Sequence, residues 1–229
     1  MNNEHVYVIG EHKIKDVPHI FRSSWKESVP YIIADENTSL VGGNFIIELF
    51  EGEAKSYIFP SGKPVYADYE NVLIIKNLLA QEPNAIAIAV GSGTINDLVK
   101  LASYELEREY MLFPTAPSVD GYTAVGSALT FDGFKKTIFC SPPAVLVADV
   151  AILRKAPSLM IAAGYGDLAA KVVAGADWLL ADSLGVEPID KEVWSMVQLD
   201  LRENISQPEA LYKRNHIAIE RLFDGLAQT

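Results

Sequence analysis

Six short apolar runs constrain the fold of this chain more than any other feature of its sequence. Each run is about five or six residues long and rich in β-branched side chains, and longer segments separate them. Ala85–Val90 and residues 144–149 are apolar on both faces, as strands are when helices cover both sides of a parallel sheet. The sequence therefore predicts an α/β fold. The predicted strands are residues 6–10, 31–35, 55–59, 85–90, 110–115 and 144–149.

The segments between these runs have their own patterns. Residues 71–80 and 98–107 carry apolar side chains at helical spacing and are predicted to be crossover helices. Residues 128–140 are predicted to form a hairpin, because Asp132-Gly133 suits the positive φ angles of a tight turn.

After Asp149 the pattern changes, and no further strand is expected. Residues 151–184 and 191–226 are helical in pattern, and residues 184–190 form a connector with a Gly and a Pro. We therefore predict a parallel-sheet domain at residues 1–151 and an all-helical part at residues 152–229.

The composition narrows the classes of partner. With 30 acidic and 19 basic residues the formal net charge is −11, and no basic block is present, which opposes a nucleic-acid partner. The single Cys140 cannot form an internal disulfide, and the first residues are polar, so a reducing, cytoplasmic setting is expected. Asp149, Asp167, Lys171 and Asp177 interrupt the most apolar region, so we expect no membrane-spanning segment. A small ligand is the remaining expectation.

A glycine-rich loop at residues 91–97 is the first candidate site. It follows a predicted strand and precedes a helix, so its backbone N–H groups are expected to bind an anion such as a pyrophosphate. The alternative is a capping box, in which Thr94 caps the helix and Asp97 reaches back to it. The candidate cofactor-binding residues here are Gly91, Gly93, Thr94, Ile95, Asn96 and Asp97.

Two further segments are expected at the same sheet edge. Asp35 ends a predicted strand, where a carboxylate can accept hydrogen bonds from ribose hydroxyls; it is equally suited to start a helix. The loop at residues 113–122 follows another strand, and its Asp120-Gly121 turn could aim a carboxylate at a ligand hydroxyl; a purely structural loop is the alternative. Its candidate cofactor residues are Thr115, Ala116, Pro117 and Ser118.

Asp167 is the candidate metal ligand. It lies in a helix of small and apolar residues, where a carboxylate needs a cation; the alternative partner is Lys171, one helical turn later. No two of the four histidines lie three or four residues apart, so no local metal motif completes Asp167. Cys140 has no paired histidine in sequence, which disfavours a nucleophilic hydrolase.

Taken in order, these motifs resemble the sn-glycerol-1-phosphate dehydrogenase family of the dehydroquinate synthase-like and iron-containing alcohol dehydrogenase superfamily. The resemblance implies a Rossmann-like sheet domain followed by an all-α domain, the latter incomplete here. It also implies an NAD(P)-dependent oxidoreductase that interconverts glycerol 1-phosphate and dihydroxyacetone phosphate with a divalent metal, zinc or nickel. The segments that carry the resemblance are residues 91–100, 113–122, 147–149, 156–157 and 163–171, together with Trp178.

The resemblance also implies roles for individual residues. Gly93 to Asp97 would hold the dinucleotide phosphates, and Thr115 to Ser118 would line the nicotinamide side. Asp120 would bind the substrate, a small phosphorylated polyol, and Asp167 would be the first metal ligand; both would take part in catalysis. The metal would polarise the substrate oxygen while hydride moves to or from nicotinamide. A homodimer is a family expectation.

Two departures from the family pattern qualify these roles. Ala124 stands where the family has a serine that contributes to the dinucleotide site, and Ser127 is the nearest hydroxyl. The family's two metal-binding histidines come from a later part of the helical domain than Thr229, so we interpret the chain as the amino-terminal two thirds of a member, with impaired or no activity of its own. The alternatives are a glycerol or other polyol dehydrogenase, dehydroquinate synthase, which fits less well, and an NAD-binding remnant without catalysis. The choices between NAD and NADP and among metals stay open.

Overall fold

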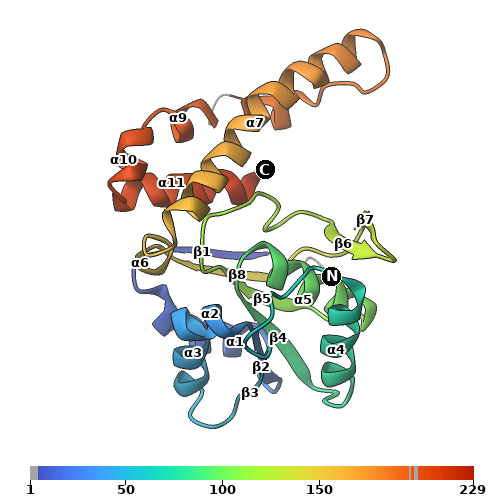
Figure 1. The fold of residues 1–229 in the computed structure, drawn as a ribbon, viewed down its shortest axis with the longest axis vertical. Coiled ribbons are helices and arrows are strands. Elements are labelled where there is room, and N and C mark those ends of the chain that lie inside the picture. The colour runs from blue at the N-terminus through green and yellow to red at the C-terminus, as the bar shows by residue number, and fades with distance from the viewer. Residues whose placement is uncertain (1–4, 196, 199–200) are drawn as a thin grey trace.

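Six parallel strands form the central sheet of the computed structural model, which describes residues 5–195, 197–198 and 201–229 (Figure 1). All neighbouring strands pair in parallel, which confirms the predicted fold class. Three strands end one or two residues earlier than predicted, and after the first of them Asp35 begins a helix instead. The order is β1 (Val6–Gly10), β8 (Val145–Asp149), β5 (Tyr110–Phe113), β4 (Ala85–Val90), β2 (Val29–Ala34) and β3 (Lys55–Ile58).

Both faces of the sheet are covered, as the apolar runs predict. Alternate strand residues enter two different cores: Ile33 and Ala89 enter one, and Ile32 and Ile88 enter the other. Helices α4 (Tyr69–Ala80) and α5 (Gly93–Glu105) pack on the first face, and α1 (Val17–Ser24) and α3 (Asn44–Leu49) pack on the second. The remaining pieces of this part are short: a 3-10 turn at Lys13–Asp16, α2 (Glu36–Thr38), a π-helical turn at Ser39–Gly43 and α6 (Val150–Leu153).

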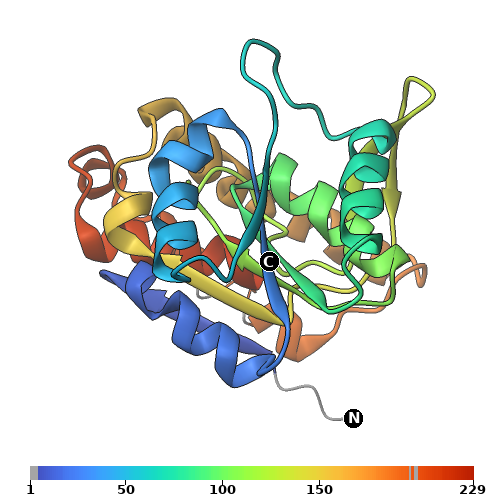
Figure 2. The same cartoon turned by 90° about the horizontal axis from the view of Figure 1, so that it is seen from below.

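The predicted hairpin is present. Strands β6 (Ser127–Phe131) and β7 (Phe134–Ile138) pair antiparallel, and Asp132 and Gly133 adopt φ angles of 48° and 79° at the turn. The hairpin lies near α4 in Figure 1 and Figure 2. The rings of Tyr69, the first residue of α4, and Phe131, the last residue of β6, stack with centroids 4.5 Å apart. The hairpin therefore extends the first core rather than the sheet.

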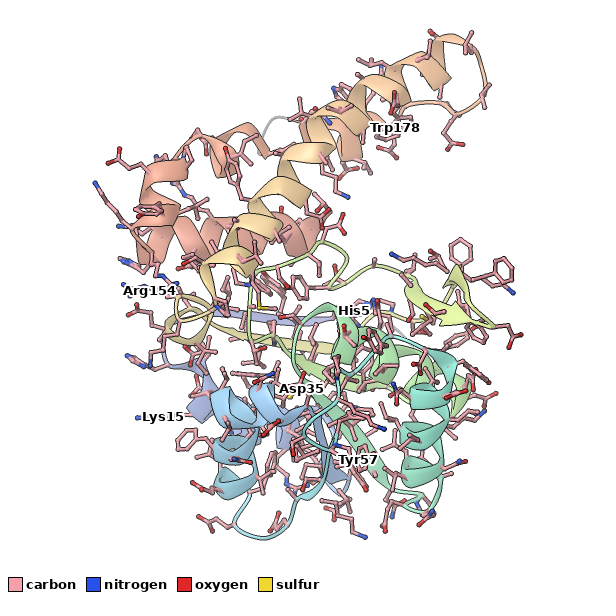
Figure 3. All side chains as sticks on the ribbon, in the orientation of Figure 1. His5, Lys15, Asp35, Tyr57, Arg154 and Trp178 are labelled. Carbon is pink, nitrogen blue, oxygen red and sulfur yellow. The ribbon has the colours of Figure 1, made fainter. Side chains whose placement is uncertain are left out.

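The helical segment begins at the carboxyl end of β8. The predicted boundary after residue 151 falls inside α6, and the first core continues across it to Ile161, Leu168 and Phe223. Figure 1 shows α7 running away from the sheet, and Figure 3 places Trp178 on its far part. The helices are α7 (Ser158–Ser183), α8 (Lys191–Ser195), α9 (Leu201–Ile205), α10 (Pro208–Tyr212) and α11 (His216–Gln228).

Helix α7 is the one helix among the described residues that is long and apolar enough to cross a membrane, although we expected no such segment. This rests on length and composition alone: the helix has 26 residues, and an 18-residue window within it has a mean hydropathy of 1.3. In this fold its first half packs against α11 and against the loop that follows β5.

Candidate dinucleotide and substrate site

The sheet has a topological switch point between β2 and β4. The chain leaves β2 towards β3 at the edge of the sheet, whereas it leaves β4 in the opposite direction, towards β5. Ile33 pairs with Ala89, so Asp35 and Gly91 follow the two strands at the same sheet edge. Figure 3 labels Asp35 there. Ligands of open α/β sheets bind in a crevice of this kind, outside the carboxyl ends of the strands.

A cavity of about 430 Å³ lies at this edge. Residues after three different strands line it, and so do residues in the first turns of α7. Six of its residues were predicted from the sequence: Asp35, Gly93, Thr94, Ile95, Thr115 and Ser118. The others were not: Thr38, Ser92, Val119, Leu159, Met160 and Ala163. Nothing in the sequence distinguished Leu159 and Met160 from ordinary core residues, because their contact with the cavity depends on how the helical segment folds back.

Helix α5 begins at the cavity without a side-chain cap. Its first residue is Gly93, and the Ser92 side chain makes no capping hydrogen bond. The predicted capping box from Thr94 to Asp97 is therefore wrong, because the helix starts two residues earlier than that box requires. The first N–H groups of a helix that lack a side-chain cap are available to an anion.

Asn96 and Asp97 face away from this cavity. The Asn96 side chain is buried, accepts a hydrogen bond from the Tyr110 hydroxyl at 2.8 Å and donates one to the Tyr122 carbonyl at 3.3 Å. Asp97 lies beneath the hairpin near Lys100, where burial raises the pKa of its carboxyl to about 6 although that cation opposes the shift. Of the predicted phosphate-binding residues, the structure brings Gly93, Thr94 and Ile95 to the cavity. Gly91 instead packs against Ile95, since an added Cβ would lie 2.7 Å from the Ile95 Cβ.

Asp35 starts a helix and also lines the cavity. Its Oδ1 accepts a hydrogen bond from the Thr38 N–H at 2.8 Å, and the Thr38 hydroxyl accepts one from the Asp35 N–H at 3.0 Å. The helix-start interpretation is confirmed, while binding of a ribose by Asp35 stays a prediction.

The loop after β5 is held from both sides. The Ser92 hydroxyl donates to the Ala116 carbonyl at 2.9 Å and accepts from the Ala116 N–H at 3.0 Å. On the other side α7 approaches closely at Gly164, where an added Cβ would lie 2.0 Å from the Pro117 carbonyl oxygen. Ala116 and Pro117 therefore connect the loop to its neighbours, while Thr115 and Ser118 face the cavity.

Asp120 and Asp167 lie next to each other. The Asp120 N–H donates a hydrogen bond to Asp167 Oδ2 at 2.8 Å. Lys171 forms an ion pair with Asp120 and not, as the alternative predicted, with Asp167, because the loop brings Asp120 within reach of the ammonium group. Both side chains of this pair are partly exposed. The cluster thus joins two carboxylates and one cation.

The residues present do not make a metal site by themselves. Catalytic zinc takes three protein ligands, whereas no group of three His, Cys, Asp or Glu side chains is suitably placed within residues 5–195, 197–198 and 201–229. Asp167 offers one carboxylate, and the neighbouring carboxylate of Asp120 is paired with Lys171. The metal-ligand role of Asp167 stays a prediction.

Burial argues against a role in the site for two further residues, Ser127 and Cys140. Ser127, the hydroxyl nearest to Ala124, is fully buried and donates to the Asp97 carbonyl at 2.8 Å, so it lies away from the cavity. Cys140 is buried, and burial raises the pKa of its thiol to about 11, which disfavours a reactive thiolate.

Comparisons with known proteins identify the family of this chain. Residues 8–157 match the family model described as iron-containing alcohol dehydrogenase. The glycerol-1-phosphate dehydrogenase [NAD(P)+] of Geobacillus thermodenitrificans is 33% identical over 205 residues, which cover 86% of this chain and 50% of that protein. The chain thus spans about half the length of the curated relatives it matches.

Solved structures with little sequence identity share the fold. Sulfoacetaldehyde reductase from Bifidobacterium kashiwanohense, in complex with NAD+, aligns with a TM-score of 0.80 at 15% identity and covers 97% of this chain and 63% of that one. Glycerol dehydrogenase from Schizosaccharomyces pombe aligns with a TM-score of 0.79 at 16% identity and covers 97% and 58%. The match to the family model covers well over half of the chain, which therefore belongs to the iron-containing alcohol dehydrogenase family.

Proposed function

We propose that this chain forms the dinucleotide half of an NAD(P)-dependent oxidoreductase that interconverts sn-glycerol 1-phosphate and dihydroxyacetone phosphate. One observation carries the proposal: the cavity at the switch point combines the uncapped start of α5, Asp35 and the loop that leads to Asp120. In this arrangement the pyrophosphate lies at Gly93 and Thr94, and Asp35 accepts from a ribose hydroxyl. Bound nicotinamide, on the side of Thr115 and Ser118, supplies the hydride chemistry.

The cluster beside this cavity supports a phosphorylated substrate. Asp120 can accept a hydrogen bond from a polyol hydroxyl, and Lys171 brings a cation next to it. An ammonium group attracts a phosphate, whereas neutral glycerol gains little from it. Glycerol dehydrogenase activity is the second candidate, since such an enzyme shares the fold. Dehydrogenation of the phosphate ester is favoured because the relatives with 33% and 34% identity are glycerol-1-phosphate dehydrogenases, whereas the glycerol dehydrogenase is only 16% identical.

Asp167 would be one ligand of a divalent metal, zinc or nickel. The described residues of this chain provide no complete ligand set, so we expect the chain alone to retain no stoichiometric metal. Asp167 still has a local task, because its carboxylate holds the Asp120 N–H in place. We also propose a cytoplasmic location, on the strength of the lone buried Cys140, and a homodimer on family resemblance.

Binding of the dinucleotide is tested at Thr94, in the first turn of α5. Thr94→Glu places a carboxylate where we expect the pyrophosphate, while an acidic residue in the first helical turn does not weaken the helix. We expect NADH affinity, measured by calorimetry, to fall at least tenfold in Thr94→Glu and much less in the neutral, equally long Thr94→Gln. Equal affinity of the two variants for NADH would contradict a phosphate site at this helix start.

Turnover separates the candidate activities. We expect NADH-dependent reduction of dihydroxyacetone phosphate, assayed with added zinc or nickel, to exceed any oxidation of glycerol by NAD+, and we expect Asp120→Asn to abolish it. Oxidation of glycerol in preference to glycerol 1-phosphate would favour the second candidate. Tight NADH binding without turnover of either substrate would instead identify a dinucleotide-binding protein without catalysis.

A further inference from the structure

A stripe of three buried polar residues runs along one side of α5. Ser92, Asn96 and Lys100 follow at intervals of four residues, so they lie on the same helix face. Their exposed fractions are 8%, 2% and 0%. Each one bonds to the backbone of the loop at residues 114–126, which leads to and follows Asp120. The start of α5 thus lies at the cavity, where we propose that the phosphates bind. One side of the same helix holds the loop that contains Asp120.

Lys100 makes the densest of these contacts. Its ammonium group donates hydrogen bonds to the carbonyls of Gly121, Ala124 and Gly126 at 3.2, 3.0 and 3.0 Å. These acceptors use all three donors that an ammonium group has. Burial of a lysine without such acceptors would be strongly unfavourable. The burial of Lys100 therefore depends on the three carbonyls, and their arrangement depends on Lys100. Asp97 is the acidic group beside this cation.

The three carbonyls that bind Lys100 belong to residues 121, 124 and 126, in and after the turn that follows Asp120. Gly121 has a φ of 72°, a left-handed conformation that most residues adopt only under strain. Lys100 fixes the carbonyl of this residue, while Asp167 holds the N–H of the residue before it. The main chain of Asp120 is therefore held on both sides, by α5 and by α7.

We propose that Lys100 is a positioning residue that fixes the Asp120 turn relative to the dinucleotide-binding end of α5. The inference rests on the proposed function for the role of Asp120, but the coupling of helix to loop is a property of the fold alone. Lys100 faces the loop backbone and lies under it, so it acts through Asp120 without touching substrate.

Lys100→Met tests this role, because methionine is similarly long and apolar but has no N–H donor. In hydrogen exchange on the 229-residue chain, we expect amides of residues 116–126 to exchange about tenfold faster or more, while those of β4 stay protected. NADH affinity should stay within about threefold, because the cavity end of α5 is unchanged. Where the chain turns over the polyol phosphate with added metal, kcat should fall at least tenfold with the KM for NADH unchanged. Lys76→Met, at a partly exposed ion pair on α4, is the matched control and should leave the loop unchanged.

Lys100→Gln is a second variant that keeps the test valid if Lys100→Met fails to fold. Its amide keeps two donors, so we expect an intermediate increase in exchange within residues 116–126. Unchanged exchange there in Lys100→Met would overturn the proposal whether or not the chain binds NADH. Unfolding of both variants would overturn it as well, because Lys100 would then act on the whole fold rather than on the loop. Failure of the parent chain to bind NADH, with the exchange result as expected, would remove the proposed function and leave the coupling intact.

Discussion

Helices α5 and α7 hold the same loop from opposite sides, yet their surroundings differ. Eight of the 13 residues of α5 are buried, including Asn96, Lys100 and Ser103. Only four of the 26 residues of α7 are buried, and apolar side chains such as Leu180 are largely exposed. The proposed dinucleotide side of the site is therefore built on a closed core, whereas the Asp167 side depends on a few contacts near the start of α7. Apolar composition alone does not show which helix is buried.

Removal of a leucine from each helix gives the largest expected contrast. Leu98 is fully buried in α5, so Leu98→Ala should lower the free energy of unfolding by about 2–5 kcal/mol. Leu180 is 59% exposed, so Leu180→Ala should change the free energy of unfolding by less than about 0.5 kcal/mol. Urea unfolding measures both. A loss at Leu180 as large as the loss at Leu98 would show that α7 is covered in solution.

The pH dependence of stability tests the buried side of the loop next. Burial raises the pKa of Asp97 from 3.8 to about 6, so the folded protein keeps this proton over a pH range in which the unfolded chain has lost it. Asp97 should therefore lower the free energy of unfolding as the pH rises from about 4 to about 6, by at most roughly 3 kcal/mol. The difference between wild type and Asp97→Asn, measured by urea unfolding at both ends of this range, isolates that contribution.

Asp132→Asn is the control for this measurement, since Asp132 is exposed at the hairpin turn. Its stability difference from wild type should vary much less with pH. If the two variants gave the same pH profile, Asp97 would not be buried as described.

A pair of glycines in α7 gives the smaller and more local contrast. Gly164→Ala would press a methyl group against the Pro117 carbonyl and should lower the free energy of unfolding by about 1–3 kcal/mol. At Gly166 an added Cβ would have no atom within 4 Å. Gly166→Ala should therefore raise the free energy of unfolding by up to about 1 kcal/mol, because alanine has the higher helix propensity. Thermal unfolding followed by circular dichroism compares the two. Stabilisation by both substitutions would mean that the loop and α7 do not approach as closely as described.

The sequence predicted the features that depend on local pattern. Ala85–Val90 was identified as a buried strand because both of its faces are apolar, and Asp132-Gly133 was identified as a turn because its residues tolerate positive φ. The cavity residues Gly93 and Thr115 were predicted because parallel strands end at one sheet edge. These inferences need only the neighbouring residues and the rules of parallel sheets.

Three errors and omissions at the site involve partners that are distant in sequence. Thr94 and Asp97 fit a capping pattern, but Ser92 is the residue that precedes the helix, and its side chain bonds to Ala116, 24 residues later. Lys171 has Asp167 one turn away and pairs instead with Asp120. The burial of Lys100 was missed for the same reason, since its three acceptors come from a loop with no regular structure. Such contacts follow from the packing of the whole chain.

The four-residue spacing of Ser92, Asn96 and Lys100 limits insertions and deletions in the gene segment that encodes α5. Each helical residue turns the chain by about 100°, so the loss or gain of one codon between Ser92 and Lys100 would rotate Lys100 away from its three carbonyls. A single substitution in the stripe removes one set of bonds, whereas such a length change separates the lysine from the loop altogether. We therefore expect α5 to tolerate exchanges of residue type far better than any change in its length.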